Sequence, residues 1–322
     1  MKPGEVVAGR FTIERPAGYG AMGAVYRAMD RLTGAPVALK VLHKEGSKRN
    51  VRFEREATLL AALRHPAVVR YVLHGATPAG APFLAMEWVD GETLSDRLTD
   101  APLSVEDSIL VMSTIASALA EAHAHGVVHR DLKPGNVLLA DGDVRRVKVI
   151  DFGIARRPES ELTATGVAIG SPGYMAPEQA RGDKDIDPRA DVFSLGCVLY
   201  RCIAGAPPFA ADDVRAVIAK ILVTEPPPLA EVAPHTPAPL AALVTRMLSK
   251  EPAARPADGG AVADALAALG PRGDGRGGVK ALGRGLTASE RRLVCVVAAA
   301  SPADIGSLDE PTTLSSSGTA LV

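Results

Sequence analysis

The chain has 322 residues and a formal net charge of −1, with 36 Lys and Arg against 37 Asp and Glu. A charge so nearly balanced gives no reason to expect binding to nucleic acid or to an anionic membrane surface. The three cysteines, Cys197, Cys202 and Cys295, are too few and too scattered for a disulfide framework. We therefore expect a reducing, cytoplasmic setting.

The start of the chain has no apolar signal core. No apolar run approaches the roughly 18 residues that a membrane span needs, so no span is expected. A chain of this length usually forms two lobes or two domains, because one core seldom serves so many residues.

After a short segment at 1–10, the first part of the chain has the pattern of a sheet. Short β-rich runs alternate with Gly, Pro and Thr, and one stretch with apolar residues at helical spacing interrupts them. The predicted strands are 11–20, 23–30, 36–42, 67–76 and 82–89, and the predicted helix is 51–64. These elements indicate a small β-rich lobe over 11–89.

From residue 90 the pattern becomes helical. A long helix is predicted over 104–126, with Ser104 as its N-cap, Asp107 as the partner in an Asp version of the capping box, and Gly126 as its end. Further helices are predicted at 188–205, 212–222, 238–250 and 260–270, and the Pro-rich segment 226–237 is expected to connect two of them. The fold class is therefore α+β, with a larger helical lobe over 90–270.

Three glycines, Gly18, Gly20 and Gly23, have G-x-G-x-x-G spacing between two predicted strands. Glycines at this spacing let backbone amides approach phosphates closely. A dinucleotide-binding Rossmann site would need a helix directly afterwards, whereas 23–30 has the pattern of a strand. Taken alone, the motif could equally be a plain glycine-rich hairpin.

Two charged residues in the first lobe have a functional and a plain interpretation. Lys40 lies in an apolar predicted strand, and Glu56 lies on the one predicted helix of this lobe. The Glu56 carboxylate could hold the Lys40 ammonium in place for a diphosphate. Each could also be an ordinary solvated charge.

The segment 127–139 gathers many polar residues between apolar flanks. It contains His129, Arg130, Asp131, Lys133 and Asn136. Together with Asp151 further along, this segment supplies the oxygen ligands that a hard cation such as Mg²⁺ prefers.

Seven elements occur in a fixed order: the glycine motif 18–25, VALK at 37–40, Glu56, HRDLKPGN at 129–136, DFG at 151–153, APE at 176–178, and DVFSLG at 191–196 followed by Arg255. In this order they resemble the eukaryotic-like (Hanks-type) protein kinase family, in its bacterial serine/threonine branch. The resemblance covers about 11–270 and implies a bilobal kinase fold.

The resemblance implies a role for each matching residue. Asp131 accepts or orients the substrate hydroxyl proton, Lys133 stabilises the transferred phosphoryl group, and Lys40, oriented by Glu56, neutralises the α- and β-phosphates of ATP. Asn136 and Asp151 bind Mg²⁺, with Mn²⁺ as an alternative metal. The residues implied to contact the nucleotide are Gly18, Tyr19, Gly20, Gly23, Val25, Ala38, Lys40, Met86 as gatekeeper, Glu87 and Val89 through their backbone, and Leu138.

Trp88, the only tryptophan, has two interpretations. It lies either beside the nucleotide, where its fluorescence would report binding, or in ordinary packing. Lys133 in the HRDLKPGN motif favours serine/threonine over tyrosine specificity. The partners implied are therefore proteins that carry Ser or Thr.

The loop between Asp151 and Glu178 is long and polar, as in kinases that are switched by ordering of this loop. Thr163 and Thr165 are its candidate phosphosites, and Arg130 and Arg156 could pair with an added phosphate. Autophosphorylation in trans, within a homodimer, is the expected route.

Ser171 stands where the family has Thr and retains the hydroxyl. Glu178 is expected to pair with Arg255 in a structural role, and Glu251 stands where the family usually has Asp.

Other patterns have plainer interpretations. His123, His125 and His129 lack a completing Cys or acid, so a metal site is not expected. Cys197 and Cys202 are expected to be buried small apolar residues. The rival functions are a nucleotide-binding pseudokinase scaffold, opposed by the presence of Lys40, Asp131, Asn136 and Asp151, and a small-molecule phosphotransferase of the aminoglycoside-kinase type, opposed by the APE segment.

The end of the chain leaves two interpretations open. Residues 271–286 are rich in Gly and Arg and are expected to be a linker. The tail at 287–322 begins with Thr287 as a candidate cap and a short apolar run, and then becomes polar and of low complexity. It is either the truncated start of a cyclase-like or sensor domain, as some bacterial kinases carry after their linker, or a disordered tail. The metal carboxylates of a cyclase are not visible, so no cyclase activity is expected.

Overall fold

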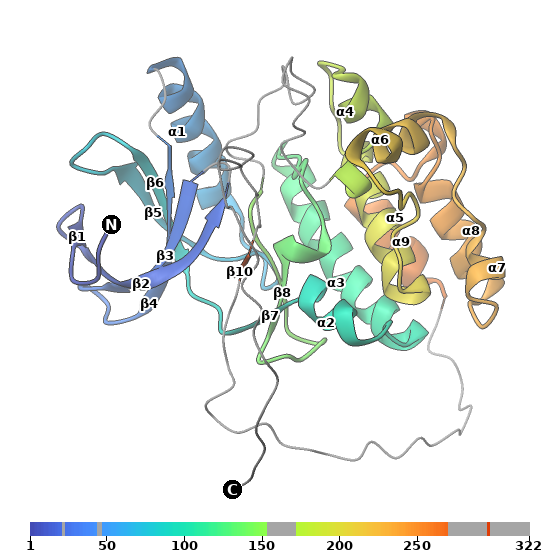
Figure 1. The fold of residues 1–322 in the computed structure, drawn as a ribbon, viewed down its shortest axis with the longest axis horizontal. Helices are drawn as coiled ribbons and strands as arrows, with labels where there is room; N and C mark the ends of the chain where they lie inside the picture. Colours follow the sequence, from blue (N-terminus) through green and yellow to red (C-terminus); the bar gives the residue numbers. More distant parts are fainter. Residues whose placement is uncertain (21–22, 44–46, 153–171, 270–294, 297–322) are drawn as a thin grey trace, which may run out of the picture.

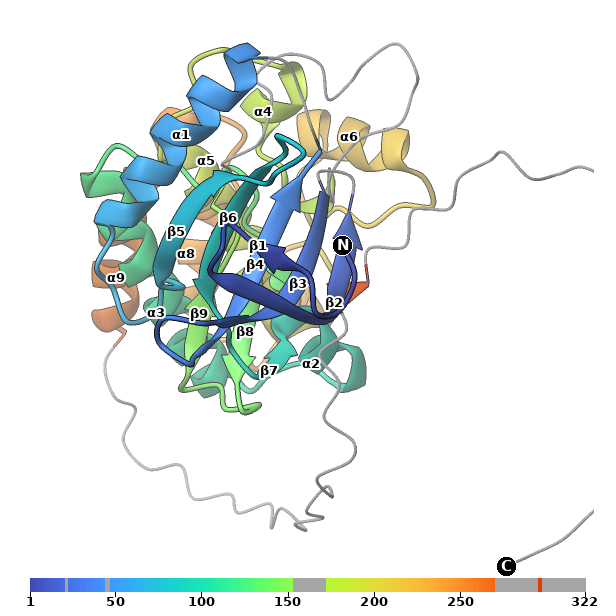
Figure 2. The same cartoon turned by 90° about the vertical axis from the view of Figure 1, so that its left-hand side faces the viewer.

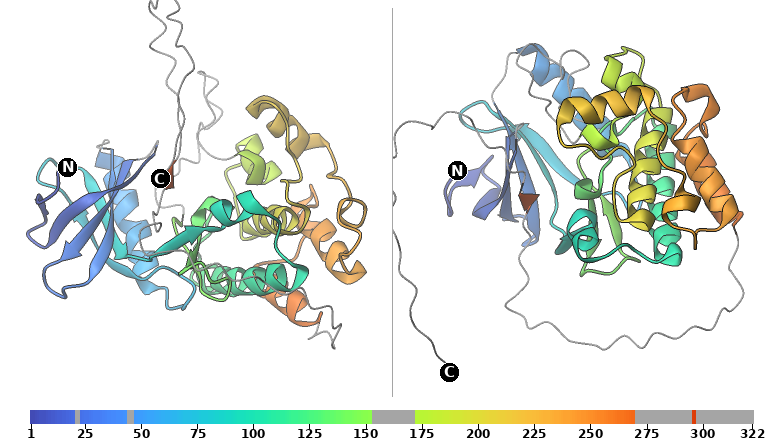
Figure 3. Two further views of the ribbon diagram at one scale, coloured as in Figure 1. Left: turned by 60° about the horizontal axis from the view of Figure 1, so that its bottom comes forward. Right: turned by 45° about the vertical axis from the view of Figure 1, so that its right-hand side comes forward.

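The computed structural model describes residues 1–20, 23–43, 47–152, 172–269 and 295–296. A twisted sheet with one long helix forms the first lobe, and a set of helices forms the second (Figure 1). Figure 3 shows the two lobes beside each other, and this arrangement confirms the bilobal α+β fold. Within the described part of the chain, no helix is both long enough and apolar enough to cross a membrane.

The first lobe is built on an antiparallel sheet with the order β1-β2-β3-β4-β6-β5. Its elements are β1 Val6–Val7, β2 Phe11–Gly20, β3 Gly23–Asp30, β4 Pro36–Leu42, α1 Ser47–Ala62, β5 Tyr71–Ala76 and β6 Pro82–Glu87. In Figure 2 this sheet faces the viewer, and the helices of the second lobe lie behind it.

Alternation along β4 decides which side chains face the second lobe. Val37 and Leu39 are buried in the core on one face of the sheet. Lys40 lies on the opposite face, since successive residues of a strand point to opposite sides. Val25 is the register partner of Lys40, and Met86 is the partner of Ala38, so these side chains share that second face.

The second lobe packs around α3 and α5. Its helices are α2 Leu94–Asp100, α3 Val105–Ala124, α4 Pro177–Arg181, α5 Arg189–Ala204, α6 Val214–Val223, α7 Leu229–Val232, α8 Ala238–Met247 and α9 Gly259–Ala267, with 3-10 turns at Pro134–Asn136, Pro172–Tyr174 and Pro252–Ala254. The helix α5 is buried on nearly all sides, as expected of a helix at the centre of a large core. The Ser104 hydroxyl caps α3 by accepting from the Asp107 N–H at 3.0 Å, which confirms the predicted N-cap.

A small second sheet lies where the lobes meet. It contains β7 Gly91–Thr93, β8 Val137–Ala140 and β9 Val147–Val149, in that order. The segment between α1 and β5 joins it, because Val68 bridges Val149 and the Val149 N–H donates to the Ala67 carbonyl at 2.7 Å. These backbone contacts attach the first lobe directly to the strand that precedes Asp151.

Most predicted elements are present, with shifted ends. The predicted strand 67–76 begins only at Tyr71, because Val68 and the Val69 N–H are engaged with Val149 instead. Sequence reasoning missed β7, β8 and β9, which have three or four residues each. It also missed α2, although Thr93 and Asp96 form a capping box at its start.

The linker at 271–286 lies outside the described residues, as does the tail except for β10, Cys295–Val296. This two-residue strand pairs in parallel with β2, opposite Gly18 and Tyr19. The two interpretations of the tail both stay predictions.

Candidate active site

One buried carboxylate holds the segment between α3 and β8 in place. Asp191, at the start of α5, accepts from the His129 N–H at 2.7 Å and from the Arg130 N–H at 2.8 Å. Its side chain is fully buried. Arg130 has a φ of +63°, a left-handed conformation that costs free energy in a residue other than glycine. The two hydrogen bonds to Asp191 hold the backbone in that conformation.

His129 is buried beneath the same segment and is held as a neutral imidazole. Burial lowers its pKa, although the nearby charge of Asp191 acts in the opposite direction. Its Nδ1 accepts from the Asp131 N–H at 3.2 Å, so its Nε2 carries the proton and donates to the Ile150 carbonyl at 3.0 Å. The His129 ring also packs on Phe152, with 4.6 Å between ring centroids. His129 therefore links Asp131 to the backbone just before Asp151.

Lys133 and Asn136 both contact the Asp131 carboxylate. The Lys133 Nζ lies 3.2 Å from the Asp131 Oδ2, and the Asn136 Nδ2 lies 3.1 Å from the same oxygen. The Asn136 Nδ2 also donates to the Asp131 carbonyl at 2.8 Å. Since two donors hold Asp131 and its N–H is bound by His129, its carboxylate has a fixed position.

Lys40 and Asp151 connect the two lobes. The Lys40 Nζ lies 2.8 Å from the Asp151 Oδ1. Burial by itself would raise the pKa of Asp151, but the charge and hydrogen bond of Lys40 outweigh it and hold that pKa below its ordinary value. Asp151 has a φ of +58°, and the adjacent Ile150 N–H donates to the Asn136 carbonyl at 3.0 Å. Asp151 is thus an ionised carboxylate beside the segment that carries Asn136.

Glu56 lies on α1, which packs against β5 and β6, and its side chain is partly buried. As stated above, Lys40 forms an ion pair with Asp151. The expected pairing of Lys40 with Glu56 stays a prediction.

The glycine motif lies at the tip of the β2–β3 hairpin, where Gly20 and Gly23 are register partners. Gly23 has a φ of +152°, and a Cβ there would lie 2.0 Å from the Val41 carbonyl oxygen. Gly20 has open space around it, since a Cβ there would lie 4.0 Å from the nearest atom. The Gly23 position therefore requires glycine for reasons of backbone packing, before any ligand is considered.

The residues whose side chains are expected around a base come from four strands, and Val25 lies on β3. Met86 is buried on β6 opposite Ala38 of β4, and Leu138 is buried on β8 of the second sheet. The Glu87 N–H donates to the Arg70 carbonyl at 2.9 Å, so this N–H is not available to a base. The Glu87 side chain accepts from the Lys148 Nζ at 2.5 Å and from the Arg70 N–H at 3.1 Å.

The family model described as "Protein kinase domain" matches residues 11–267. The chain belongs to the protein kinase family.

Several curated bacterial serine/threonine-protein kinases are similar to it. The DNA damage-responsive serine/threonine-protein kinase RqkA of Deinococcus radiodurans is 40% identical over 82% of this chain and 40% of its own length. The kinase pkn2 of Myxococcus xanthus is 40% identical over 82% of this chain and 33% of its own length, and PknB of Mycolicibacterium smegmatis is 40% identical over 76% and 40%. These relatives support the bacterial serine/threonine branch. The chain matches less than half of the length of each of the three.

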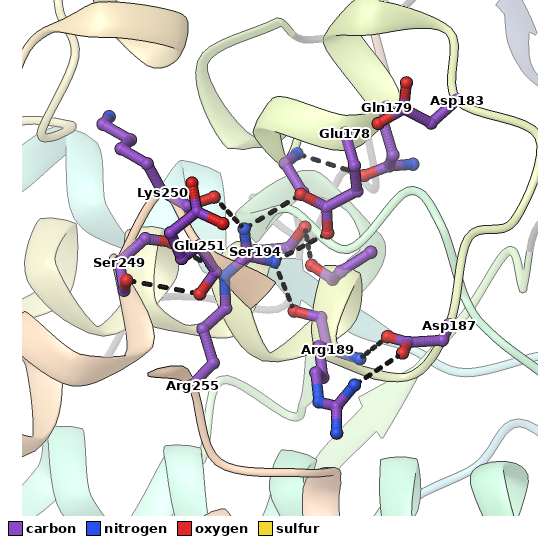
Figure 4. Close-up of polar contacts among 12 residues, drawn as sticks. Glu178, Gln179, Asp183, Asp187, Arg189, Ser194, Ser249, Lys250, Glu251 and Arg255 are labelled. Atoms are coloured by element: carbon purple, nitrogen blue, oxygen red, sulfur yellow. Dashed lines mark hydrogen bonds and ion pairs between the residues drawn. The ribbon is translucent and has the colours of Figure 1, made fainter. Parts of the chain in front are cut away.

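The expected Glu178–Arg255 pair of the kinase domain is present (Figure 4). The Arg255 Nη1 and Nη2 donate to the two Glu178 carboxylate oxygens at 2.6 and 2.9 Å, and the pair is buried. The next residue along, Gln179, donates from its Nε2 to the Arg130 carbonyl at 3.0 Å. The APE segment is thereby connected to the segment that carries Asp131.

Three histidines and two cysteines had plain structural interpretations in the sequence. His123 and His129 both bond to Asp191, whereas the His125 Nδ1 lies against the Glu121 carbonyl. No group of three or more metal-ligating His, Cys, Asp or Glu side chains occurs among the residues that the structure describes. Cys197 and Cys202 are buried as predicted, and burial raises the pKa of both thiols, that of Cys202 to about 12.

In the sequence, Asp191 is part of the DVFSLG motif, and no role was predicted for it. Nothing near Asp191 in the sequence shows that it contacts His129 and Arg130, about 60 residues earlier. The activation-loop residues Arg156, Thr163, Thr165 and Ser171 lie outside the described part of the chain. Their expected roles stay predictions.

Proposed function

We propose that the protein is an ATP-dependent serine/threonine protein kinase, which transfers the γ-phosphoryl group of Mg·ATP to Ser or Thr hydroxyls of other proteins. The observation that carries the proposal is the cluster of Asp131, Lys133 and Asn136 beside the Lys40–Asp151 ion pair, at the junction of the lobes. Phosphoryl transfer of this kind depends mostly on positioning and on electrostatic stabilisation, and this cluster can supply both.

The donor set fits Mg²⁺. Asp151 is an ionised carboxylate, and the Asn136 amide nitrogen is engaged with Asp131, so its amide oxygen is the atom that a cation would use. Two protein oxygens, completed by phosphate oxygens and water, make a common Mg²⁺ site, and Mn²⁺ accepts similar ligands. When bound, the metal would neutralise charge on the phosphates.

The remaining roles belong to side chains of the chain itself. We assign to Asp131 the orientation of the substrate hydroxyl and the acceptance of its proton, because two donors fix this carboxylate. We assign to Lys133, whose Nζ lies 3.2 Å from the Asp131 Oδ2, the stabilisation of charge on the transferred group. Lys40, with Glu56 as its proposed second partner, would neutralise the α- and β-phosphates.

The first test compares the wild type with Lys40→Met and Asp131→Asn, each with Mg·ATP and a generic protein substrate. The wild type should give phosphoserine or phosphothreonine, and Asp131→Asn should be slower by on the order of 10²-fold or more, since a positioned base is lost. Phosphotyrosine as the main product would contradict the specificity. A wild type that binds nucleotide without transferring phosphate would instead support the pseudokinase scaffold.

We further propose that the enzyme activates itself by autophosphorylation in trans at Thr163 and Thr165. Each phosphate adds close to two negative charges, which Arg130 and Arg156 could neutralise. Wild type mixed with Lys40→Met should place phosphate on the Lys40→Met chain, as identified by intact mass. Full activity of a Thr163→Ala/Thr165→Ala double variant would contradict this activation.

The need for ATP supports the predicted cytoplasmic setting of this domain.

A further inference from the structure

The indole of Trp88 lies against two arginines of the glycine-rich hairpin. The Arg15 guanidinium carbon is 5.4 Å from the ring centroid, and that of Arg27 is 5.6 Å from it. Both distances are within the range of a cation–π contact. Trp88 follows β6 directly, in the connection between the lobes, while Arg15 is on β2 and Arg27 is on β3.

The two arginines would destabilise the hairpin without such a partner. Arg15 and Arg27 are register partners across the β2–β3 ladder. Like charges directly opposite each other in a sheet repel. Here both guanidiniums meet the negative face of one aromatic ring, and Arg27 also forms an ion pair with Glu14.

The position of the arginines makes the contact relevant to the nucleotide. Arg15 lies three residues before Gly18, and Arg27 lies four residues after Gly23. The ladder changes register on either side of Arg15 and Pro16, so the strand is irregular where the Trp88 contact is made. The contact therefore holds the middle of the hairpin whose tip carries the glycine motif.

Hydrogen bonds from the indole nitrogen and from the backbone also hold Trp88 in place. The Trp88 Nε1 donates to the Asp90 Oδ1 at 2.8 Å, and the Trp88 N–H donates to the Pro36 carbonyl at 3.3 Å. The Asp90 carbonyl in turn accepts from the Asp141 N–H, at the end of β8. Trp88 is thus anchored to both lobes.

We propose that Trp88, with Arg15 and Arg27, is a positioning residue that holds the glycine-rich hairpin in the orientation that receives ATP. This rests on the proposed function, in which the hairpin covers the phosphates. A hairpin that is already oriented loses less conformational entropy when the nucleotide binds. Loss of the contact weakens nucleotide binding, but a saturating nucleotide orders the hairpin and restores the rate.

The test measures KM for ATP, kcat with a generic substrate, and the dissociation constant of Mg·ADP by calorimetry. Trp88→Leu should raise KM and the dissociation constant by about three- to tenfold, with kcat within about twofold of wild type. Trp88→Phe, which retains an aromatic face, should recover most of the affinity. Arg15→Met should weaken binding in wild type and much less in Trp88→Leu, because both changes remove one contact.

Arg31→Met is the matched control, since Arg31 is an exposed arginine directly after the end of β3. It should leave KM and the dissociation constant unchanged. The proposal is overturned if Trp88→Leu binds Mg·ADP as tightly as wild type, if Trp88→Phe is as weak as Trp88→Leu, or if Arg15→Met behaves like Arg31→Met. A fall in kcat with unchanged affinity also overturns it.

One outcome separates this inference from the proposed function. A wild type that binds Mg·ADP but does not transfer phosphate contradicts the proposed function, and the dissociation constants of the variants still decide the role of Trp88. If Trp88→Leu does not fold, the Arg15→Met and Arg27→Met variants decide it, because they leave the indole in place. A wild type that binds no nucleotide overturns both.

Discussion

Glu178 and Arg255, 77 residues apart, form a buried bidentate ion pair, and Arg255 fills the rest of its donor capacity with backbone carbonyls. Its Nε donates to the Ser249 carbonyl at 2.8 Å, and its Nη1 donates to the Arg189 carbonyl at 3.0 Å. This one guanidinium joins α4, the start of α5 and the segment before α9. Such a fully satisfied buried pair holds those segments in one arrangement.

We predict that Arg255→Met lowers the free energy of unfolding by about 3–5 kcal/mol, because it leaves the Glu178 carboxylate buried without its cation. Arg255→Lys should recover only part of this, since an ammonium cannot reproduce the planar fork. The Glu178→Gln/Arg255→Met double variant should be more stable than Arg255→Met alone. Denaturant unfolding measures all three, and an Arg255→Met variant as stable as wild type would contradict a structural role for the pair.

Asp191 allows a test of how the segment that carries Asp131 is held in place. Asp191→Asn replaces a carboxylate that accepts from His129, Arg130 and His123 with an amide that has one acceptor oxygen and an NH₂ group. The Arg130 backbone then loses a partner that stabilises its positive φ. We expect kcat to fall by on the order of tenfold or more, as a displaced catalytic group does, with little change in KM for ATP.

The control for Asp191→Asn is its melting temperature relative to that of Ser194→Ala, which removes another buried polar group of α5. Ser194→Ala should lose stability but retain kcat. An Asp191→Asn enzyme with wild-type kcat would show that the hydrogen bonds to His129 and Arg130 do not position Asp131.

Two glycines of the same motif should differ in their tolerance of alanine. Gly23→Ala places a Cβ 2.0 Å from the Val41 carbonyl at a φ of +152°, so we expect a loss of about 1–3 kcal/mol in the free energy of unfolding. Gly20→Ala meets no atom closer than 4.0 Å and should leave that free energy nearly unchanged. Thermal unfolding of the two variants checks the difference. Equal stability would contradict the packing explanation for Gly23.

The sequence predicted what depends on local spacing. Asp131, Lys133 and Asn136 lie within six residues, so their convergence follows from one short segment, and Glu178 with Arg255 followed from the family's pattern. Other contacts between distant segments were not accessible. Nothing near Asp191 shows that it lies under His129, and nothing near Trp88 shows that Arg15 and Arg27 converge on its ring.

Short elements were missed for a related reason. The strands β7, β8 and β9 are too short for an alternating pattern to be recognised, and pairing with one another and with Val68 is what stabilises them. The strand predicted at 67–76 started late because its first residues joined that second sheet. Tertiary pairing, which a linear pattern does not contain, decided these boundaries.

Asp30, at the end of β3, should make the stability of the first lobe depend on pH. Its carboxylate accepts from the Arg10 Nε and Nη2, both at 2.7 Å, and also from the Leu32 N–H and the Thr33 hydroxyl. The hydrogen bond from Arg10 is the largest influence on Asp30 and, against the opposing effect of burial, it holds the pKa of this carboxyl well below its usual range.

A folded-state pKa below the unfolded value of about 4 stabilises the protein above that pH, and the stabilisation is lost as the pH falls through the folded-state pKa. Asp30→Asn should therefore lower the free energy of unfolding by about 1.5–3 kcal/mol at pH 7, since it replaces charge-assisted hydrogen bonds. The difference in the free energy of unfolding between wild type and Asp30→Asn should shrink as the pH is lowered below 4. Asp183→Asn, which breaks the exposed pair with Arg181, should change stability little at any pH. A difference between wild type and Asp30→Asn that stayed constant from pH 7 to pH 2 would show that the Asp30 charge does not contribute.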